Sequence, residues 1–120
     1  MRIIIADDQK HARSGLRALL AASLPAPSIW EARNGLEAER LAAEVSPDVI
    51  LMDLNMPQLD GLEATRRIKG RNPAIGIIVL SLDGSKGQEA IAAGADGFVA
   101  KGENTDKLLA AIARLPRPGA

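Results

Sequence analysis

The stretch from Pro47 to Pro57 limits the fold more than any other part of the chain, because it is an apolar run that ends on a carboxylate. Its branched residues and the two flanking prolines indicate a strand buried on both faces, as in a parallel sheet. Asp53 is then the last residue of this strand. Ligands of open parallel sheets bind beyond the carboxyl ends of the strands. We therefore expect a functional role for Asp53, with capping of the next turn as the structural alternative.

Short apolar runs and segments with helical spacing alternate along the rest of the chain. The strands are expected at residues 2–6, 28–32, 75–81 and 97–101, and the helices at 9–24, 36–45, 62–69 and 85–93, with a last helix that Asn104 or Thr105 caps. In the first helix, leucines share one face, and Arg13 and Arg17 are expected elsewhere on the surface. Gly70 to Pro73 is expected to break the third helix. Glycines in and beside residues 85–93 lower the helix preference there by about 1 kcal/mol for each interior glycine.

Five strands that alternate with helices predict an α/β fold, in which helices cover both faces of a parallel sheet. Right-handed crossovers place the carboxyl ends of all five strands at the same edge of that sheet. Residues 1–115 are expected to form this single domain, since the chain has room for one domain with a real core. Residues 116–120 read Pro-Arg-Pro-Gly-Ala and cannot continue a helix, so they are expected to be the start of a linker or a disordered tail.

Four of the expected strands end on side chains capable of chemistry, which the topology brings to one edge. They are Asp7 and Asp8 after the first strand, Asp53 after the third, Ser81 after the fourth and Lys101 on the fifth. Two carboxylates about 5 Å apart repel each other by roughly 3 kcal/mol at an effective dielectric constant of 20. A cluster of three acids therefore requires positive charge, which Lys101 and a divalent cation would supply. Hard oxygen ligands without histidine or cysteine favour Mg²⁺ or Mn²⁺ over Zn²⁺, and Asp8, Asp53 and the backbone carbonyl of Asn55 fit that demand.

A hard metal beside a carboxylate, a lysine and a hydroxyl is typical of sites for phosphoryl transfer. The metal and Lys101 would neutralise charge on the phosphoryl oxygens, and Ser81 would donate a hydrogen bond. Asp53 could be the nucleophile and form an aspartyl phosphate. These residues alone leave open whether the protein is a switch that is itself modified or an enzyme that turns over a substrate.

The joint order and spacing of these motifs resemble the receiver domain of bacterial two-component response regulators. The matching motifs are Asp7-Asp8, Asp53-Leu54-Asn55-Met56-Pro57 with Asp60-Gly61, Ser81 and Phe98-Val99-Ala100-Lys101. The resemblance extends from Ile3 to Leu115 and implies a flavodoxin-like (CheY-like) doubly wound sheet of five parallel strands in the order 2-1-3-4-5. The run from Gly94 to Phe98, with no proline after Lys101, resembles receivers attached to helix-turn-helix outputs.

The resemblance also implies a chemistry for the acidic residues. Asp53 would be the phosphoacceptor, with a histidine kinase, a phosphotransfer protein or a small acyl phosphate as the donor. Asp8, Asp53 and the backbone carbonyl of Asn55 would be ligands of Mg²⁺, with Mn²⁺ as an alternative ion. Asp7 would act on the metal through water.

By the same resemblance, Lys101 holds the phosphoryl group, and Ser81 and Phe98 form a switch pair whose rearrangement reports phosphorylation. The implied protein is a signalling switch that assists its own phosphorylation and dephosphorylation, and not a turnover enzyme. Its output is expected to be transcriptional, through a C-terminal DNA-binding effector domain in the full-length protein. The resemblance also allows a homodimer that forms on phosphorylation.

Two other functions stay open beside this one. The first is a receiver-like interaction module that works without phosphorylation. The second is a Mg²⁺-dependent phosphatase that passes through an aspartyl phosphate. Such enzymes usually need a second acid near the nucleophile and a cap over the substrate. Here Asn55 stands two residues after Asp53, and the chain has no spare length for a cap.

Composition argues against several kinds of partner. The 15 acidic and 15 basic residues cancel, so no general field would draw this domain to DNA or to an anionic membrane. Trp30 and Phe98 are the only aromatic residues, which makes a platform for stacking nucleic-acid bases hard to assemble. No segment has signal-peptide character or membrane-spanning length, so a cytoplasmic location is expected.

Overall fold

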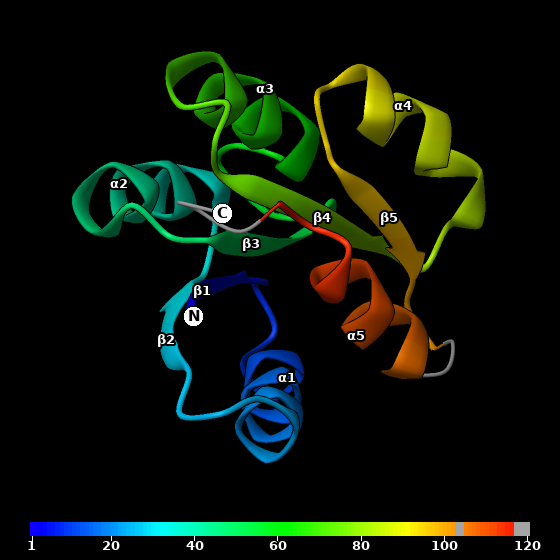
Figure 1. The fold of residues 1–120 in the computed structure, drawn as a ribbon. Helices are drawn as coiled ribbons and strands as arrows, with labels where there is room; N and C mark the ends of the chain where they lie inside the picture. The colour runs from blue at the N-terminus through cyan, green and yellow to red at the C-terminus, as the bar shows by residue number, and fades with distance from the viewer. Residues whose placement is uncertain (103–104, 117–120) are drawn as a thin grey trace.

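The computed structural model describes residues 1–102 and 105–116, in which strands and helices alternate along the chain (Figure 1). The strands are β1 (Arg2–Ala6), β2 (Ser28–Ala32), β3 (Val49–Asp53), β4 (Gly76–Ser81) and β5 (Gly97–Ala100). The helices are α1 (Lys10–Ser23), α2 (Gly35–Val45), α3 (Gly61–Arg71), α4 (Gly87–Ala92) and α5 (Thr105–Ala113), and a short 3₁₀-helix, η1 (Gly84–Lys86), precedes α4. Asn104, one of the two predicted caps, and residues 117–120 of the predicted tail lie outside the described residues.

The strands form one sheet in the order β2-β1-β3-β4-β5, and every pair is parallel, which confirms the predicted topology. β3 is the middle strand and is buried at all five positions, as its unbroken apolar sequence predicts. Ile50 of β3 lies beside Ile4 of β1 on one side and beside Ile77 of β4 on the other. This register brings the carboxyl ends of β1, β3 and β4 to the same edge of the sheet.

Alternate residues of each strand face different helix layers, because successive side chains of a strand point to opposite faces. Ile50 and Met52 of β3 pack in a core with residues of α2, α3 and α4. Val49 and Leu51 pack in a second core with residues of α1 and α5. Figure 1 shows α2, α3 and α4 on one face of the sheet and α1 and α5 on the other. Each fully buried aliphatic side chain contributes about 1.5–3 kcal/mol, so the two cores together hold the strand register that builds the site.

The third helix is longer than predicted. The sequence predicts a break from Gly70, but α3 continues through Gly70 and ends at Arg71. The next residue, Asn72, is the C-cap, and its N–H donates to the carbonyl oxygen of Ile68 at 2.9 Å. An interior glycine costs about 1 kcal/mol relative to alanine. The two additional residues make up less than one turn, and Lys69 holds this end of the helix by donating to Asp96 and to the carbonyl oxygens of Pro73 and Ile75.

The segment predicted as one helix over residues 85–93 consists of η1 and the six-residue α4. The carboxylate of Asp83 accepts a hydrogen bond from the N–H of Ser85 at 2.9 Å and starts η1. Gly94 ends the segment with a backbone angle φ of +107°, which glycine adopts readily. β5 ends at Ala100, one residue earlier than predicted.

The loop between β3 and α3 depends on a glycine. A β-carbon at Gly61 would overlap the carbonyl oxygen of Asp53, so only glycine allows the start of α3 to approach the end of β3 so closely. Asp60 caps this helix, because its side chain accepts a hydrogen bond from the N–H of Glu63 at 2.9 Å. Asp60 and Gly61 therefore start α3 in close contact with the backbone of Asp53.

Candidate functional site

The carboxyl edge of the sheet gathers four of the predicted site residues. Asp7 follows β1 directly, Asp53 and Ser81 are the last residues of β3 and β4, and Lys101 follows β5. Asp7 and Ser81 are each 1% exposed, and Asp53 is 5% exposed. Buried polar groups are costly unless they have partners. The contacts of these buried side chains therefore indicate the function of this edge of the sheet.

Lys101 links two of the carboxylates. Its ammonium nitrogen Nζ lies 2.9 Å from Oδ2 of Asp7 and 3.1 Å from Oδ1 of Asp53. The N–H of Lys101 donates to the carbonyl oxygen of Ser81 at 2.7 Å, so the pairing with β4 continues one residue beyond β5. This backbone bond and the two carboxylates place the lysine charge between the ends of β1 and β3.

Asp8 completes an acidic cluster with Asp7 and Asp53. One carboxylate oxygen from each of the three residues lies within 4.8 Å of the others. At that distance two carboxylates repel each other by roughly 3 kcal/mol at an effective dielectric constant of 20. One lysine balances only part of three acidic charges. The donors are all hard oxygen atoms, which suit Mg²⁺ or Mn²⁺, so the residues of the cluster fit a divalent cation.

Two pKa shifts follow from this arrangement. Burial raises the pKa of Asp53 above its usual value, the charges of Asp7 and Asp8 raise it further, and Lys101 opposes the rise. For Lys101, burial alone would lower the pKa, but the hydrogen bonds and charges of Asp7 and Asp53 outweigh it and raise the pKa. Lys101 therefore stays charged at neutral pH, while Asp53 lies in a site that favours its neutral form more than water does.

Asp7 is held from three sides: by Lys101, by the N–H of Gln9, which donates to its Oδ1 at 2.9 Å, and by Nη1 of Arg13, which donates to its backbone carbonyl oxygen at 2.8 Å. The prediction that Arg13 lies on the surface is wrong, because this side chain is buried. Its second partner is Glu31 on β2, at 2.9 Å from Nε. The spacing of leucines identifies the core face of α1, but it does not reveal that an arginine beside that face finds two acceptors.

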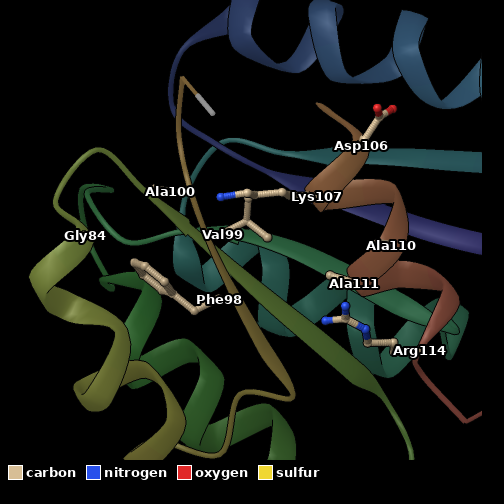
Figure 2. A pocket seen from close by; sticks show the side chains of 9 residues that line it. All are labelled: Gly84, Phe98, Val99, Ala100, Asp106, Lys107, Ala110, Ala111 and Arg114. Atoms are coloured by element: carbon tan, nitrogen blue, oxygen red, sulfur yellow. The ribbon is translucent and has the colours of Figure 1, made fainter. Parts of the chain in front are cut away.

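Three further predicted site residues are Asn55, Ser81 and Phe98. Asn55 is exposed in the loop after β3 and lines a cavity of about 210 Å³ together with Ser81. The hydroxyl oxygen of Ser81 accepts a hydrogen bond from the N–H of Asp83 at 3.1 Å. Phe98 is half-buried on β5 beside Val79, and Figure 2 shows its ring directed away from α5 and toward α4. The roles of these residues in phosphoryl transfer and in switching stay predictions.

A larger cavity, of about 640 Å³, lies between β5 and α5 (Figure 2). Its wall combines apolar residues of β5, including Phe98 and Val99, with Lys107 and Arg114 of α5. Phe98 therefore borders both α4 and this cavity.

A family model described as the response regulator receiver domain matches residues 3–113. The chain belongs to this family. The match begins at the second residue of β1, spans the other four strands and includes the acidic cluster, so it confirms the resemblance that the motifs indicated.

The receiver domain is similar to two transcriptional regulatory proteins of Bacillus subtilis (strain 168). LiaR is 40% identical over 114 residues, which cover 93% of this chain and 54% of LiaR, and LnrK is 37% identical over 114 residues, which cover 93% of this chain and 52% of LnrK. Among solved structures, the receiver domain is similar to the response regulator protein TrrA from Thermotoga maritima in complex with Mg(2+)-BeF. The TM-score is 0.88 at 28% identity, with coverage of 96% of this chain and 98% of that chain.

The receiver domain spans about half the length of LiaR and LnrK, 54% and 52% respectively. No helix in residues 1–102 and 105–116 of the receiver domain is long and apolar enough to cross a membrane.

Proposed function

We propose that this receiver domain is a phosphorylation-controlled switch that accepts a phosphoryl group on Asp53 in a Mg²⁺-dependent reaction. The position of Asp53 carries the proposal: it is a buried carboxylate at the end of β3, 3.1 Å from Lys101 and in one cluster with Asp7 and Asp8. A carboxylate nucleophile needs neighbouring cations to accept an anionic donor. A structural relative, TrrA, was solved in complex with Mg(2+)-BeF, which supports a Mg²⁺-dependent reaction for this fold.

In the proposed reaction, a carboxylate oxygen of Asp53 attacks the phosphorus of the donor and forms an O–P bond. The bond between phosphorus and the leaving group breaks, and the leaving group keeps the electron pair. A carboxylate leaves from an acyl phosphate, and an imidazole leaves from a phosphohistidine. Lys101 would pair with the new phosphoryl oxygens. The hydroxyl oxygen of Ser81 accepts the N–H of Asp83, so its own proton can be donated to the phosphoryl group.

Asp8, Asp53 and the backbone carbonyl of Asn55 would hold the cation, with Asp7 acting through water. When bound, Mg²⁺ or Mn²⁺ supplies positive charge that offsets the charge of the phosphoryl oxygens. The grouping of carboxylate oxygens within 4.8 Å supports this set of ligands. Asp7 would also keep Lys101 in place, since its Oδ2 accepts from the ammonium group at 2.9 Å.

Phosphorylation would then shift an equilibrium between two states in which Ser81 and Phe98 change position together. Phe98 lines the cavity between β5 and α5 (Figure 2), so this face is the surface whose partner affinity would change. A histidine kinase, a phosphotransfer protein or a small acyl phosphate would be the donor. LiaR and LnrK are transcriptional regulatory proteins, which supports a DNA-binding effector as the output. The proposal includes a cytoplasmic location and dimerisation on phosphorylation.

Intact mass spectrometry after incubation with a small acyl phosphate tests the proposal. With Mg²⁺, the wild type is expected to gain one phosphoryl group, and it is expected to gain none in EDTA or in the Asp53→Asn variant. Asp48→Asn is the matched control, because it makes the same change just before the opposite end of β3, where Asp48 accepts from the N–H of Arg2 at 2.7 Å. A gain that persists in Asp53→Asn would contradict the assignment. No gain under any condition would favour an interaction module that works without phosphorylation.

A further inference from the structure

We infer that Arg13 is a positioning residue for the Asp7–Asp8 half of the cation site, and that Glu31 on β2 holds Arg13 in place. The inference deepens the proposed function and rests on it. The side chain of Arg13 is only 9% exposed, which is rare for an arginine unless it is paired. A buried guanidinium requires acceptors for its donors, so the identity of those acceptors indicates what the side chain does.

Two hydrogen bonds orient the guanidinium group. Nη1 of Arg13 donates to the carbonyl oxygen of Asp7 at 2.8 Å, and Nε donates to Oε1 of Glu31 at 2.9 Å. The second oxygen of Glu31 accepts from Nε of Arg17 at 2.9 Å. Burial alone would raise the pKa of Glu31, but the hydrogen bonds and charges of Arg13 and Arg17 outweigh it and lower the pKa. Glu31 therefore stays ionised and anchors the arginine.

The bond to the Asp7 carbonyl controls the direction in which the chain leaves β1. The carbonyl group of Asp7 and the nitrogen of Asp8 belong to one planar peptide unit. A donor held against that carbonyl oxygen therefore limits the rotation of the whole unit. Asp8 is exposed and follows this peptide directly, so the position from which its carboxylate reaches the cation depends on the orientation that Arg13 sets.

The beginning of α1 makes this contact more important. Gln9 occupies the N-cap position of α1, and its side chain makes no capping hydrogen bond. The side chains of Asn34 and Asp60, by contrast, cap α2 and α3. Of these three helices, α1 is the one whose N-cap side chain makes no capping hydrogen bond. The bond from Arg13 to the carbonyl oxygen of Asp7 connects α1 to the end of β1 instead.

Arg17 separates the effect of position from the effect of charge. It lies on the same helix as Arg13, carries the same charge and binds the same carboxylate of Glu31. Its other hydrogen bond goes to the carbonyl oxygen of Ile29 at 3.2 Å and not to Asp7. Loss of either arginine removes one positive charge near Glu31, but only loss of Arg13 frees the Asp7 carbonyl from its guanidinium partner.

Isothermal titration calorimetry with Mg²⁺ alone, in the absence of any phosphoryl donor, tests the inference. Groups that orient the ligands of a metal typically change its affinity 10–100-fold when they are mutated. We expect Arg13→Met to weaken Mg²⁺ binding by about tenfold and Arg17→Met to change it by less than about twofold. Arg13→Lys keeps the charge without the planar fork of donors and is expected to give an intermediate loss.

Lys69→Met is the control for a general loss of stability. The ammonium group of Lys69 donates to the carbonyl oxygens of Pro73 and Ile75 and to Asp96, outside the acidic cluster. This variant is expected to unfold at a lower urea concentration and to bind Mg²⁺ as the wild type does. If Arg13→Met does not fold, the comparison of Arg13→Lys with Arg17→Met decides the question.

Equal Mg²⁺ affinity in the wild type and the Arg13 variants would overturn the inference. An equal loss in Arg13→Met and Arg17→Met would also overturn it, because the cause would then lie in their shared partner Glu31 and not in the bond to the Asp7 carbonyl. A wild type that does not bind Mg²⁺ would overturn the proposed function and the inference together. A wild type that binds Mg²⁺ and becomes phosphorylated, with no effect of Arg13 on affinity, would overturn the inference alone.

Discussion

Replacement of Lys101 by methionine removes the cation shared by Asp7 and Asp53 and keeps most of the side-chain length. Asp7 is 1% exposed and Asp53 is 5% exposed, so neither carboxylate recovers full hydration when the ammonium group is lost. In buffer without divalent ions, the two acids then face each other with their main counter-charge removed. The folded state is destabilised, while the unfolded chain, in which both carboxylates are hydrated, is affected little.

The size of the effect follows from the burial of the three groups. Loss of one partner from a buried ion pair costs about 3–5 kcal/mol. The side chain of Lys101 is 25% exposed, so water replaces part of its interaction with the acids. Burial and the neighbouring acids raise the pKa of Asp53, so protonation of this carboxylate costs less free energy than it does in water. We therefore expect Lys101→Met to lower the free energy of unfolding by about 3 kcal/mol at pH 7 in EDTA, the lower end of that range.

Urea unfolding followed by circular dichroism measures this loss, and its pH dependence identifies the cause. Lys101 lowers the pKa of Asp53 in the wild type, so its removal raises that pKa further. The folded variant then binds more protons than the unfolded chain, and its stability falls as the pH rises from the ordinary aspartate value to the raised one. The loss is expected to be largest at neutral pH and to shrink as the pH approaches 3.8, the ordinary value for aspartate.

Two variants control this experiment. Lys10→Met makes the same change at an exposed position of α1 and is expected to alter stability by less than about 0.5 kcal/mol. Asp53→Asn, added to Lys101→Met, is expected to restore most of the lost stability, because it removes one of the two unpaired acids. A loss below about 0.5 kcal/mol for Lys101→Met, or a loss that Asp53→Asn leaves unchanged, would refute the electrostatic reasoning.

Three further predictions concern the same edge of the sheet, and one of them has a matched control in α1. Asp53→Asn alone is expected to stabilise the protein against urea at pH 7 in EDTA and to lose this advantage near pH 3.8, because the raised pKa of Asp53 makes its charged form costly in the folded state. Gly61→Ala is expected to lower the free energy of unfolding by about 2–3 kcal/mol, since the new β-carbon overlaps the Asp53 carbonyl. Gly15→Ala, where a β-carbon meets nothing within 4 Å, is expected to stabilise α1 by about 0.5–1 kcal/mol. Mg²⁺ is expected to raise the thermal unfolding temperature of the wild type, because a ligand of the folded state stabilises it, and to raise that of Asp8→Asn less.

Each of these predictions has an outcome that contradicts it. If Asp53→Asn stabilised the protein equally at pH 3.8 and pH 7, the charge of Asp53 would not be the cause of the stabilisation. Equal effects of alanine at Gly61 and Gly15 would show that the approach of α3 to β3 is not tight. An equal rise of the unfolding temperature in the wild type and in Asp8→Asn would place the bound Mg²⁺ away from Asp8.

Much of the fold is readable from a few local features. The apolar run that ends at Asp53 predicts a strand buried on both faces, and alternation with helices predicts a parallel sheet, because a parallel connection needs a crossover. The position of acids, a hydroxyl and a lysine at the ends of strands then predicts a shared edge. The structure brings Asp7, Asp53 and Lys101 together there, whereas their roles in phosphoryl transfer stay predictions.

Other features depend on contacts between distant segments. Arg13 has a polar side chain at a helical position that sequence reasoning assigns to the surface, and its burial requires Glu31 of β2 and the end of β1. Gly70 weakens a helix locally, but α3 continues through it, where Lys69 donates to Asp96 and to the carbonyl oxygens of Pro73 and Ile75. In both cases a tertiary contact outweighs the local signal.

The amino-acid sequence alone predicts where the strands lie to within a residue at their ends, which edge of the sheet carries charge and what kind of ion the acids fit. These properties follow from the spacing of apolar residues along the chain and from the preference of hard cations for oxygen donors. Both can be read from short segments of the sequence. The contacts of Lys101 with both Asp7 and Asp53, and of Arg13 with the peptide between Asp7 and Asp8, depend on how distant elements pack. Hydrogen bonds and ion pairs form only when the distance between donor and acceptor is correct to a few tenths of an ångström. Such distances are set only when separate elements pack against one another.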